Sequence, residues 1–247
     1  MMADQAPEST GDGRFETTDW GLIKVAKGGD SSSARQALSD LCSFYWYPLY
    51  VYIRQRGYPA DRAQDLTQGF FASLLGTDFL DTISPEKGRF RAFLLASLKN
   101  YLSNEHDRDE ALKKGGGCVT MSLNLLEAEG RYACEPWHEM TAERLFERRW
   151  ALTLLGHVLD RLGGEMCLAG KGPLFARLRP ALLGDGEMAP YKQVAEDLRM
   201  TEDAVKMAAL RLRRRYRALV RQEVARTVGD SVRVDDEIRD LMAALSP

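Results

Sequence analysis

The stretch YKQVAEDLRMTEDAVKMAALRLRRRYRALVR, residues 191–221, decides the fold of this chain. Its apolar residues are spaced so that two helices can pack on each other across a short turn, with a small residue where they approach most closely. Thr201 stands where it can cap the second helix, and Glu202 and Asp203 follow in the first turn, where the helix dipole favours acids. The stretch therefore predicts a helix-turn-helix, with packing positions Val194, Ala195, Leu198, Met200, Val205 and Ala208.

The second helix of this unit has an apolar back and a basic front. Residues 204–222 include seven basic side chains and no acid, and the apolar residues recur on the opposite side. Such a helix can lie in a DNA major groove, with its first residues near base edges and its later arginines near phosphates. The alternative is a solvated basic helix in a bundle, which is disfavoured because like charges repel unless an anion offsets them. Arg199 stands at the turn position that often takes glycine, so it needs a left-handed or distorted backbone.

The rest of the chain repeats the helical spacing. No segment shows the sustained alternation of a strand, so the fold is predicted to be all-α. Helices are expected over 60–75, 90–106 and 145–162, with a middle helix ending by Leu183 and an apolar stripe over 38–53 that Pro48 should kink. Residues 1–14 are expected to form a disordered leader, and 111–140 a flexible linker. Two small helical domains, 15–110 and 141–225, are then followed by an acidic C-terminal extension, 226–247.

Composition and charge exclude several classes of function. The 247 residues carry a net charge of only −2, so any nucleic-acid surface must be local. No apolar run approaches the ~18 residues of a membrane span, and the acidic N-terminus does not resemble a signal peptide. The chain is therefore expected to be cytoplasmic, with no membrane contact.

No pattern of catalytic chemistry is present either. The scattered cysteines lack a C-x-x-C pair and suit reduced thiols, and neither a phosphate loop nor a nucleophile motif occurs. We therefore predict no enzyme activity, no catalytic residue and no cofactor. A zinc site at Cys118, Cys134 and His138 is conceivable from the C-x3-H spacing but disfavoured, so no metal is predicted.

Two blocks of the sequence, in this order, resemble a known family. DLTQ at 65–68, FF at 70–71, LL at 74–75, GRFRAFL at 88–94 and KNY at 99–101 resemble sigma domain two, and residues 191–219 resemble the helix-turn-helix of sigma domain four. Over about residues 17–221 the chain is thus similar to bacterial RNA polymerase sigma factors of the extracytoplasmic-function (ECF) subfamily. The resemblance implies binding to core RNA polymerase, through its largest-subunit clamp helices and its β flap, and promoter recognition for transcription initiation.

The resemblance also implies three sets of site residues. The polymerase-docking set is Asp61, Asp65, Thr67, Gln68 and Phe71. The set that holds the opened minus-ten strand is Lys87, Arg89, Arg91, Lys99, Asn100, Tyr101 and Asn104. The set that reads the minus-thirty-five element is Thr201, Glu202, Asp203, Lys206, Met207, Arg211, Arg213, Arg214 and Arg217. Phe90, Phe93 and Tyr101 could stack on unpaired bases, but their spacing favours a core position for Phe90 and Phe93 and leaves Tyr101 open.

The docking set departs from the family pattern. Where the family commonly has acids around DLTQ, this chain has Arg62, Ala63, Gln64 and Gly69. Phosphorylation of Thr67 by a Ser/Thr kinase would add about −1.5 to −2 charges there. The alternative is that Asp61 and Asp65 suffice.

The C-terminal extension is a second departure. Ile238, Leu241, Met242 and Leu245 share one helix face behind a cluster of acids. Either it folds back near the basic helix and weakens DNA binding, or it simply stabilises the second domain. An anti-sigma factor is a further candidate partner.

The rival function is a helix-turn-helix regulator that binds operator DNA without polymerase, its N-terminal domain sensing a ligand or partner.

Overall fold

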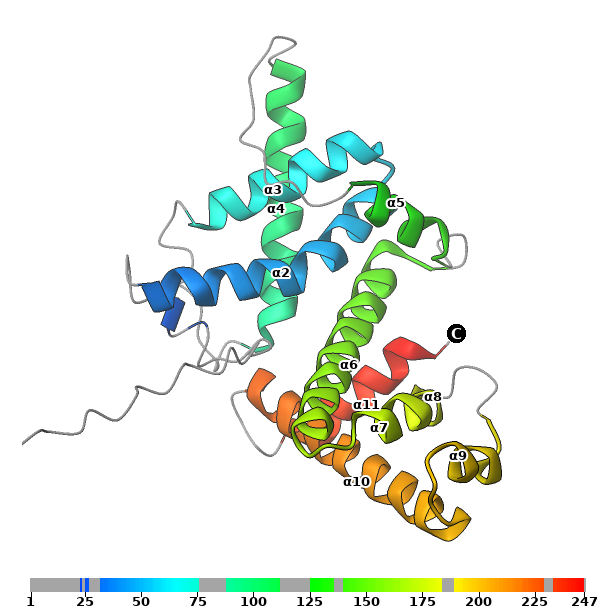
Figure 1. Ribbon diagram of the computed structural model, residues 1–247. Helices are drawn as coiled ribbons and strands as arrows, with labels where there is room; N and C mark the ends of the chain where they lie inside the picture. Colours follow the sequence, from blue (N-terminus) through cyan, green and yellow to red (C-terminus); the bar gives the residue numbers. More distant parts are fainter. Residues whose placement is uncertain are drawn as a thin grey trace, which may run out of the picture.

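The computed structural model describes residues 32–75, 88–111, 125–135, 140–183, 189–228 and 233–246, together with Ile23, Val25 and Ala26. These residues form helices with no strand among them, which confirms the all-α prediction (Figure 1). The helices are α2 (Ser32–Gln55), α3 (Ala60–Leu75), α4 (Phe90–Ala111), α5 (Leu125–Ala133), α6 (Ala142–Leu168), α7 (Gly172–Leu178), α8 (Pro180–Leu183), α9 (Tyr191–Asp197), α10 (Glu202–Thr227) and α11 (Val234–Leu245).

The helix ends follow local sequence signals. α3 has the expected bounds, and α2 continues through Pro48 to Gln55. α6 begins earlier than its apolar stripe because Thr141 caps it: the Arg144 amide donates to the Thr141 hydroxyl oxygen at 3.2 Å. Capping residues therefore mark the start of this helix better than hydrophobic periodicity does.

The long helix α6 joins the two halves of the molecule. It packs along α2 near its start and against α10 and α11 further on (Figure 1). Leu49 and Ile53 of α2 and Phe146 and Trp150 of α6 are among the fully buried side chains of one continuous hydrophobic core. The two expected domains therefore do not form separate bodies in this structure.

The prediction of a flexible linker over 111–140 is wrong for residues 125–135. This segment contains α5, and Arg54 of α2 donates two hydrogen bonds to Glu129 of α5, at 2.8 and 3.0 Å. Tyr50 donates to the same carboxylate at 2.5 Å, and Tyr47 donates to Glu135 at 3.1 Å. The hydrogen bond from Arg54 lowers the pKa of Glu129 below its ordinary value of 4.5. This part of the predicted linker is held against α2 because Glu129 and Glu135 accept hydrogen bonds from that helix.

The acidic extension also forms a helix, α11, which packs on α6 and α10. Val234 and Leu241 are buried, but Met242, expected on the apolar face, is half exposed. None of the helices in the described part of the chain combines the length and apolar character that crossing a bilayer requires.

Candidate nucleic-acid interface

The turn between α9 and α10 closes with a left-handed residue. Arg199 has φ of 54°, its amide donates to the Glu196 carbonyl at 3.2 Å, and the Met200 amide donates to the Ala195 carbonyl at 2.9 Å. This pair of bonds is the Schellman arrangement, in which glycine is the usual left-handed residue. The expectation of a left-handed backbone at Arg199 is confirmed, at the cost of strain that a glycine would not carry.

The start of α10 follows the predicted capping pattern. Thr201 has an extended backbone, and its hydroxyl oxygen accepts a hydrogen bond from the Ala204 amide at 3.2 Å. Behind the cap, Val194 and Ala195 of α9 and Val205 and Ala209 of α10 are buried against each other's helices. The helix-turn-helix predicted from residues 191–221 is therefore present.

The outward side of α10 carries cationic groups that differ in their surroundings. Arg214 and Arg217 are exposed and have no ion-pair or hydrogen-bond partner among the described residues. Lys206 pairs with Glu202 at 2.8 Å and with Asp203 at 3.6 Å on its own helix, and the hydrogen bond to Glu202 raises its pKa. Arg213 donates to the Tyr191 hydroxyl at 3.4 Å. Arg211 is likewise exposed without such a partner, so these three guanidinium groups are the strongest candidates for phosphate contacts on this helix.

Other arginines of the basic segment are neutralised by acids from elsewhere in the chain. Arg215 donates two hydrogen bonds to Glu165 of α6, at 2.8 and 2.7 Å, and Arg221 pairs with Asp235 of α11. The hydrogen bonds from Arg215 hold the pKa of Glu165 below its ordinary value. Sequence inspection missed Glu165, because it lies outside the basic segment and no local spacing connects it to Arg215.

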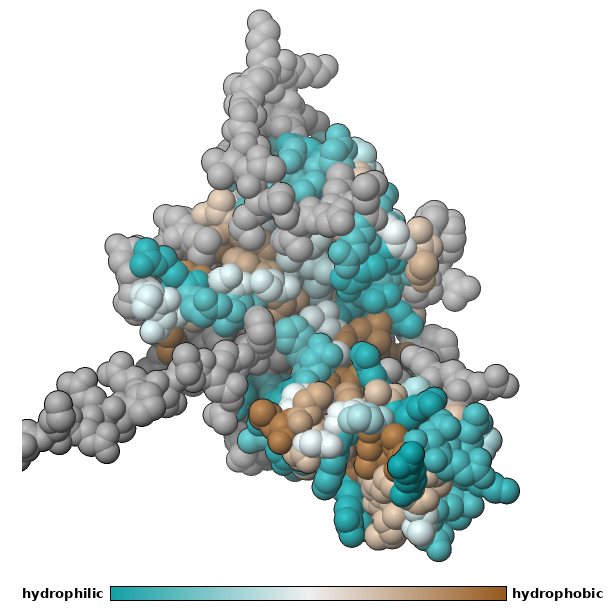
Figure 2. Space-filling model, viewed as in Figure 1, coloured by the Kyte–Doolittle hydropathy of each residue, from teal (hydrophilic) through white to brown (hydrophobic). Residues whose placement is uncertain are grey.

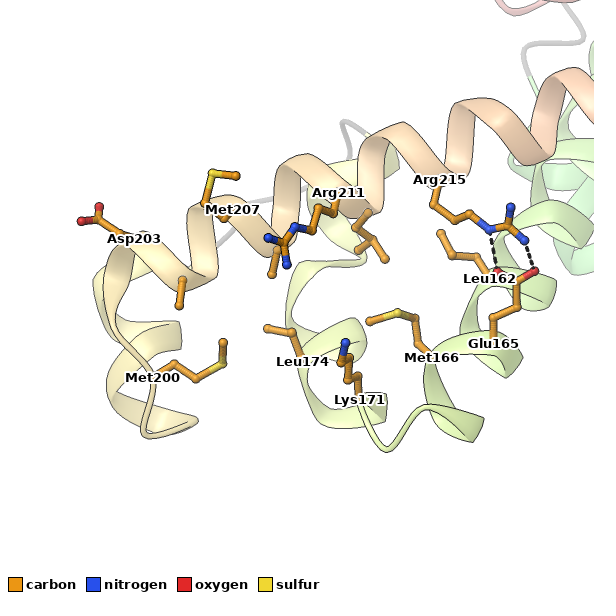
Figure 3. Close-up of a pocket in the computed structure, with 13 residues that line it drawn as sticks. Leu162, Glu165, Met166, Lys171, Leu174, Met200, Asp203, Met207, Arg211 and Arg215 are labelled. Carbon is orange, nitrogen blue, oxygen red and sulfur yellow. Dashed lines mark hydrogen bonds and ion pairs between the residues drawn. The ribbon is translucent and has the colours of Figure 1, made fainter.

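An apolar groove of about 590 Å³ lies between α6, α7 and α10. Met166 and Leu174 face Arg211 across it, and the Arg215–Glu165 pair closes one end (Figure 3). Figure 2 shows apolar side chains gathered in this part of the molecule and bordered by hydrophilic ones. The groove shares Asp203, Met207 and Arg211 with the predicted minus-thirty-five set, so these residues border two surfaces at once.

The predicted docking set on α3 is divided by burial. Asp61 and Asp65 are exposed and Gln68 is half-buried. Thr67 is fully buried, with its hydroxyl donating to the Ala63 carbonyl at 2.7 Å, and Phe71 is also buried. The prediction that Thr67 presents its hydroxyl to a kinase or a partner is wrong, because the apolar spacing of α3 turns this position into the core; Phe71 is likewise a core residue.

The predicted minus-ten set on α4 is divided in the same way. Lys99, Asn100 and Asn104 are exposed, and Lys99 pairs with Glu143 of α6 at 2.8 Å. Tyr101 is half-buried beside Phe70, with ring centroids 5.6 Å apart. Phe90 is buried and Phe93 packs against the core, as expected, and Lys87 lies outside the described residues.

Arg89 and Arg91, at the start of α4, are already bound to carboxylates. Arg91 is only 4% exposed and pairs with Glu147 of α6 at 2.6 Å and with Glu237 of α11. Arg89 pairs with Glu237 at 2.7 Å and with Asp240. The expectation that Arg91 is open to a DNA strand is wrong for this conformation, because Arg91 is buried between residues of α6 and α11. Arg89 is ion-paired with α11, but its side chain remains 38% exposed.

A second hollow, of about 430 Å³, surrounds Lys99 between α2, α4 and the start of α6. Its lining includes Arg56, Tyr58 and His106, which the sequence motifs did not indicate. The sequence signal that could have located it is Arg56-Gly57-Tyr58, a glycine between a basic residue and a tyrosine. The glycine permits the turn, since Gly57 has φ of 94°.

The described residues contain no group of three or more His, Cys, Asp or Glu side chains placed to hold a metal ion. Cys118 and His138, considered for a zinc site, lie outside these residues, and Cys134 is a free, exposed thiol. No protein-family model, curated protein or solved structure matches this chain. Its function must be argued from the surfaces described above and from the motifs in its sequence.

Proposed function

We propose that this protein is an ECF-type sigma factor, which binds core RNA polymerase in the cytoplasm and directs it to promoters. The observation that carries the proposal is the helix-turn-helix, whose second helix has a buried apolar back and exposes Arg214 and Arg217 without partners among the described residues. The motif resemblance over 65–101 adds the polymerase-binding half of the proposal. In this reading α2–α4 serve as sigma domain two and α6–α10 as sigma domain four.

In the proposed complex α10 lies in the major groove of duplex DNA. Its first two turns, with Asp203 and Lys206, would face base edges, and Arg214 and Arg217, two and three turns after Lys206, would reach phosphates. Such contacts add affinity through counterion release, which makes binding steeply dependent on salt.

The exposed side of α4 would hold the opened strand. Lys99, Asn100 and Asn104 offer one cation and two amides, and the hollow at Lys99 adds Arg56 and Tyr58. Cations beside aromatic rings suit single-stranded nucleic acid, since phosphates bind the first and bases stack on the second.

The groove between α6, α7 and α10 would receive a polymerase segment. Its walls include Met166, Met200 and Met207, and flexible methionine side chains adapt to the apolar face of an amphipathic helix. The β flap is the partner that we assign to this groove. Asp61 and Asp65 on α3 remain available for the clamp helices.

Run-off transcription with purified core polymerase on genomic promoter fragments tests the proposal. A specific transcript that requires both proteins is expected. Specific binding to duplex DNA by the protein alone, without any transcript when core enzyme is added, would instead establish the rival function of an operator-binding regulator.

The groove assignment has its own control. Met166→Glu places a charge in the groove and should weaken the affinity for core polymerase at least tenfold, because burying an unpaired carboxylate is strongly unfavourable. Leu168→Glu adds the same charge at a side chain that is 90% exposed and does not line the groove, and should bind normally. Equal binding by both variants would refute the assignment.

A further inference from the structure

The acidic helix α11 forms ion pairs with Arg89 and Arg91, two arginines that the family resemblance assigns to the minus-ten strand. The Glu237 carboxylate forms ion pairs with both Arg89 and Arg91, and Asp240 forms an ion pair with Arg89. These arginines flank the first residue of α4, whereas their acids lie about 150 residues later in the chain. The contact therefore joins the C-terminal helix to the predicted minus-ten surface.

The centre of this contact is closed to solvent. Glu237 is fully buried, Arg91 is nearly so, and the Arg91 guanidinium lies over the Trp150 ring, 4.0 Å from its centroid. Glu147 of α6 provides the second carboxylate for Arg91. A carboxylate buried to this degree needs cationic partners, so the position of Glu237 depends on the two arginines.

A fourth ion pair of α11 extends the contact to the other predicted DNA-binding element, α10. Asp235, at the start of α11, pairs with Arg221 near the end of α10, and the arginine lowers the pKa of Asp235. α11 thus bridges the N-terminal end of α4 and the C-terminal part of α10, lying across α6 (Figure 1).

We propose that α11 is an intramolecular competitor of promoter DNA. Its carboxylates hold Arg89 and Arg91 in place of the phosphates of the opened strand, and α11 must leave before these arginines can bind that strand. The proposal rests on the proposed function, in that it takes the minus-ten surface as the DNA site. The sequence suggested that the C-terminal extension weakens DNA binding at the helix-turn-helix. The ion pairs of Glu237 and Asp240 indicate that it acts instead at the start of α4.

Two properties of the contact favour competition over simple stabilisation. Guanidinium groups bind carboxylates and phosphates through the same forked donors, so one arginine cannot serve both fully. The outer ion pairs of α11 are also open to solvent: the side chains of Asp235 and Asp240 are 67% and 51% exposed, although Val234, Leu241 and the partly buried Ile238 and Leu245 anchor the helix on the core. Ion pairs that solvent can reach can be displaced by a polyanion that offers the same arginines many charges.

The full chain and its variants can be compared for binding to fluorescently labelled oligothymidine. Glu237→Gln keeps the shape of the side chain and removes its charge, so the open form becomes more populated and affinity should rise about threefold to tenfold. Asp236→Asn removes one charge from the same helix, but Asp236 pairs only with Arg239 of α11 among the described residues. The control should bind like the wild type, which separates the ion pairs from a change in net charge.

Asp240→Asn tests the same contact with a variant that is less prone to misfold than Glu237→Gln, because Asp240 is exposed and forms an ion pair with Arg89. It should also tighten binding, by a smaller factor. Hydrogen exchange of residues 233–246 should accelerate when oligothymidine binds the wild type. Unchanged exchange, or equal affinity of Glu237→Gln, Asp240→Asn and Asp236→Asn, would overturn the proposal.

The same variants distinguish this proposal from the proposed function. If no variant supports run-off transcription but Glu237→Gln still tightens oligothymidine binding, competition by α11 holds and the sigma-factor function fails. If the wild type transcribes normally and Glu237→Gln neither tightens strand binding nor raises transcription, the function holds and competition by α11 fails.

Discussion

Arg214 and Arg215 are adjacent on α10 but have opposite surroundings, which makes them a matched pair for testing the DNA-reading face. Arg214 is exposed without a partner among the described residues, whereas Arg215 donates two hydrogen bonds to Glu165. Replacing either by glutamine lowers the net charge of the protein by the same amount. Any difference between the two variants in DNA affinity therefore reports on geometry and not on total charge.

The expected magnitude follows from counterion release. One lost phosphate contact changes the slope of log K against log salt by about 0.9, equivalent to about 1.2 kcal/mol at about 0.1 M salt relative to 1 M. Arg214→Gln should thus raise the Kd for duplex promoter DNA roughly eightfold. Arg215→Gln should change it less than about twofold, because that guanidinium is already neutralised.

Fluorescence anisotropy with a duplex promoter fragment, titrated at several salt concentrations, measures both the Kd and the slope. The complex with core polymerase is the preferred sample if the protein alone binds weakly. The reasoning is refuted if Arg215→Gln loses as much salt dependence as Arg214→Gln, or if Arg214→Gln loses none. Either result would mean that the outward face of α10 does not contact phosphates.

Three further predictions concern stability and can be checked by thermal or urea unfolding. Thr67→Val should change the free energy of unfolding by less than about 1 kcal/mol, whereas Thr67→Asp should lose more than about 3 kcal/mol because it buries a charge; tolerance of aspartate would contradict the burial of this position. Arg199→Gly should stabilise the protein by about 0.5–1 kcal/mol by relieving the left-handed strain, and Arg199→Ala, which keeps that strain, should not. Because Arg54 lowers the pKa of Glu129, their pairing stabilises the fold above the ordinary pKa of 4.5 and is lost as the pH falls through the lowered value. Glu129→Gln should therefore flatten the acid limb of the stability curve, and an unchanged limb would assign the acid sensitivity to other groups.

The helix-turn-helix could be predicted from the sequence because its determinants are local. The cap at Thr201, the left-handed Arg199 and the buried Val194 and Val205 all act within one short segment, where helical periodicity fixes which side chains meet. The same periodicity predicted the burial of Phe90. It also contained the information that Thr67 is buried, since Ala63, Thr67 and Phe70 follow the core spacing of α3; the motif resemblance outweighed that signal.

The helix at 125–135 and the ion pairing of Arg89 and Arg91 could not be predicted in this way. Both depend on ion pairs between residues far apart in sequence: Arg54 with Glu129, and Arg91 with Glu237. A charged residue on a predicted helix is compatible with solvent, DNA or a distant partner, and local spacing does not distinguish among them.

Opposite charges within one chain have a consequence for function. The segments that suit DNA are basic, at the start of α4 and along α10, while α11 is acidic, so the protein contains its own competing anion and has a net charge near zero. In a protein without DNA this pairing neutralises cations that would otherwise repel one another. With DNA present, every arginine released by α11 gains a phosphate and every carboxylate freed is repelled by the same strand. Both effects favour the release of α11 when DNA binds, and both weaken as salt is added. The ionic strength at which DNA displaces α11 should therefore track the ionic strength at which the protein binds DNA.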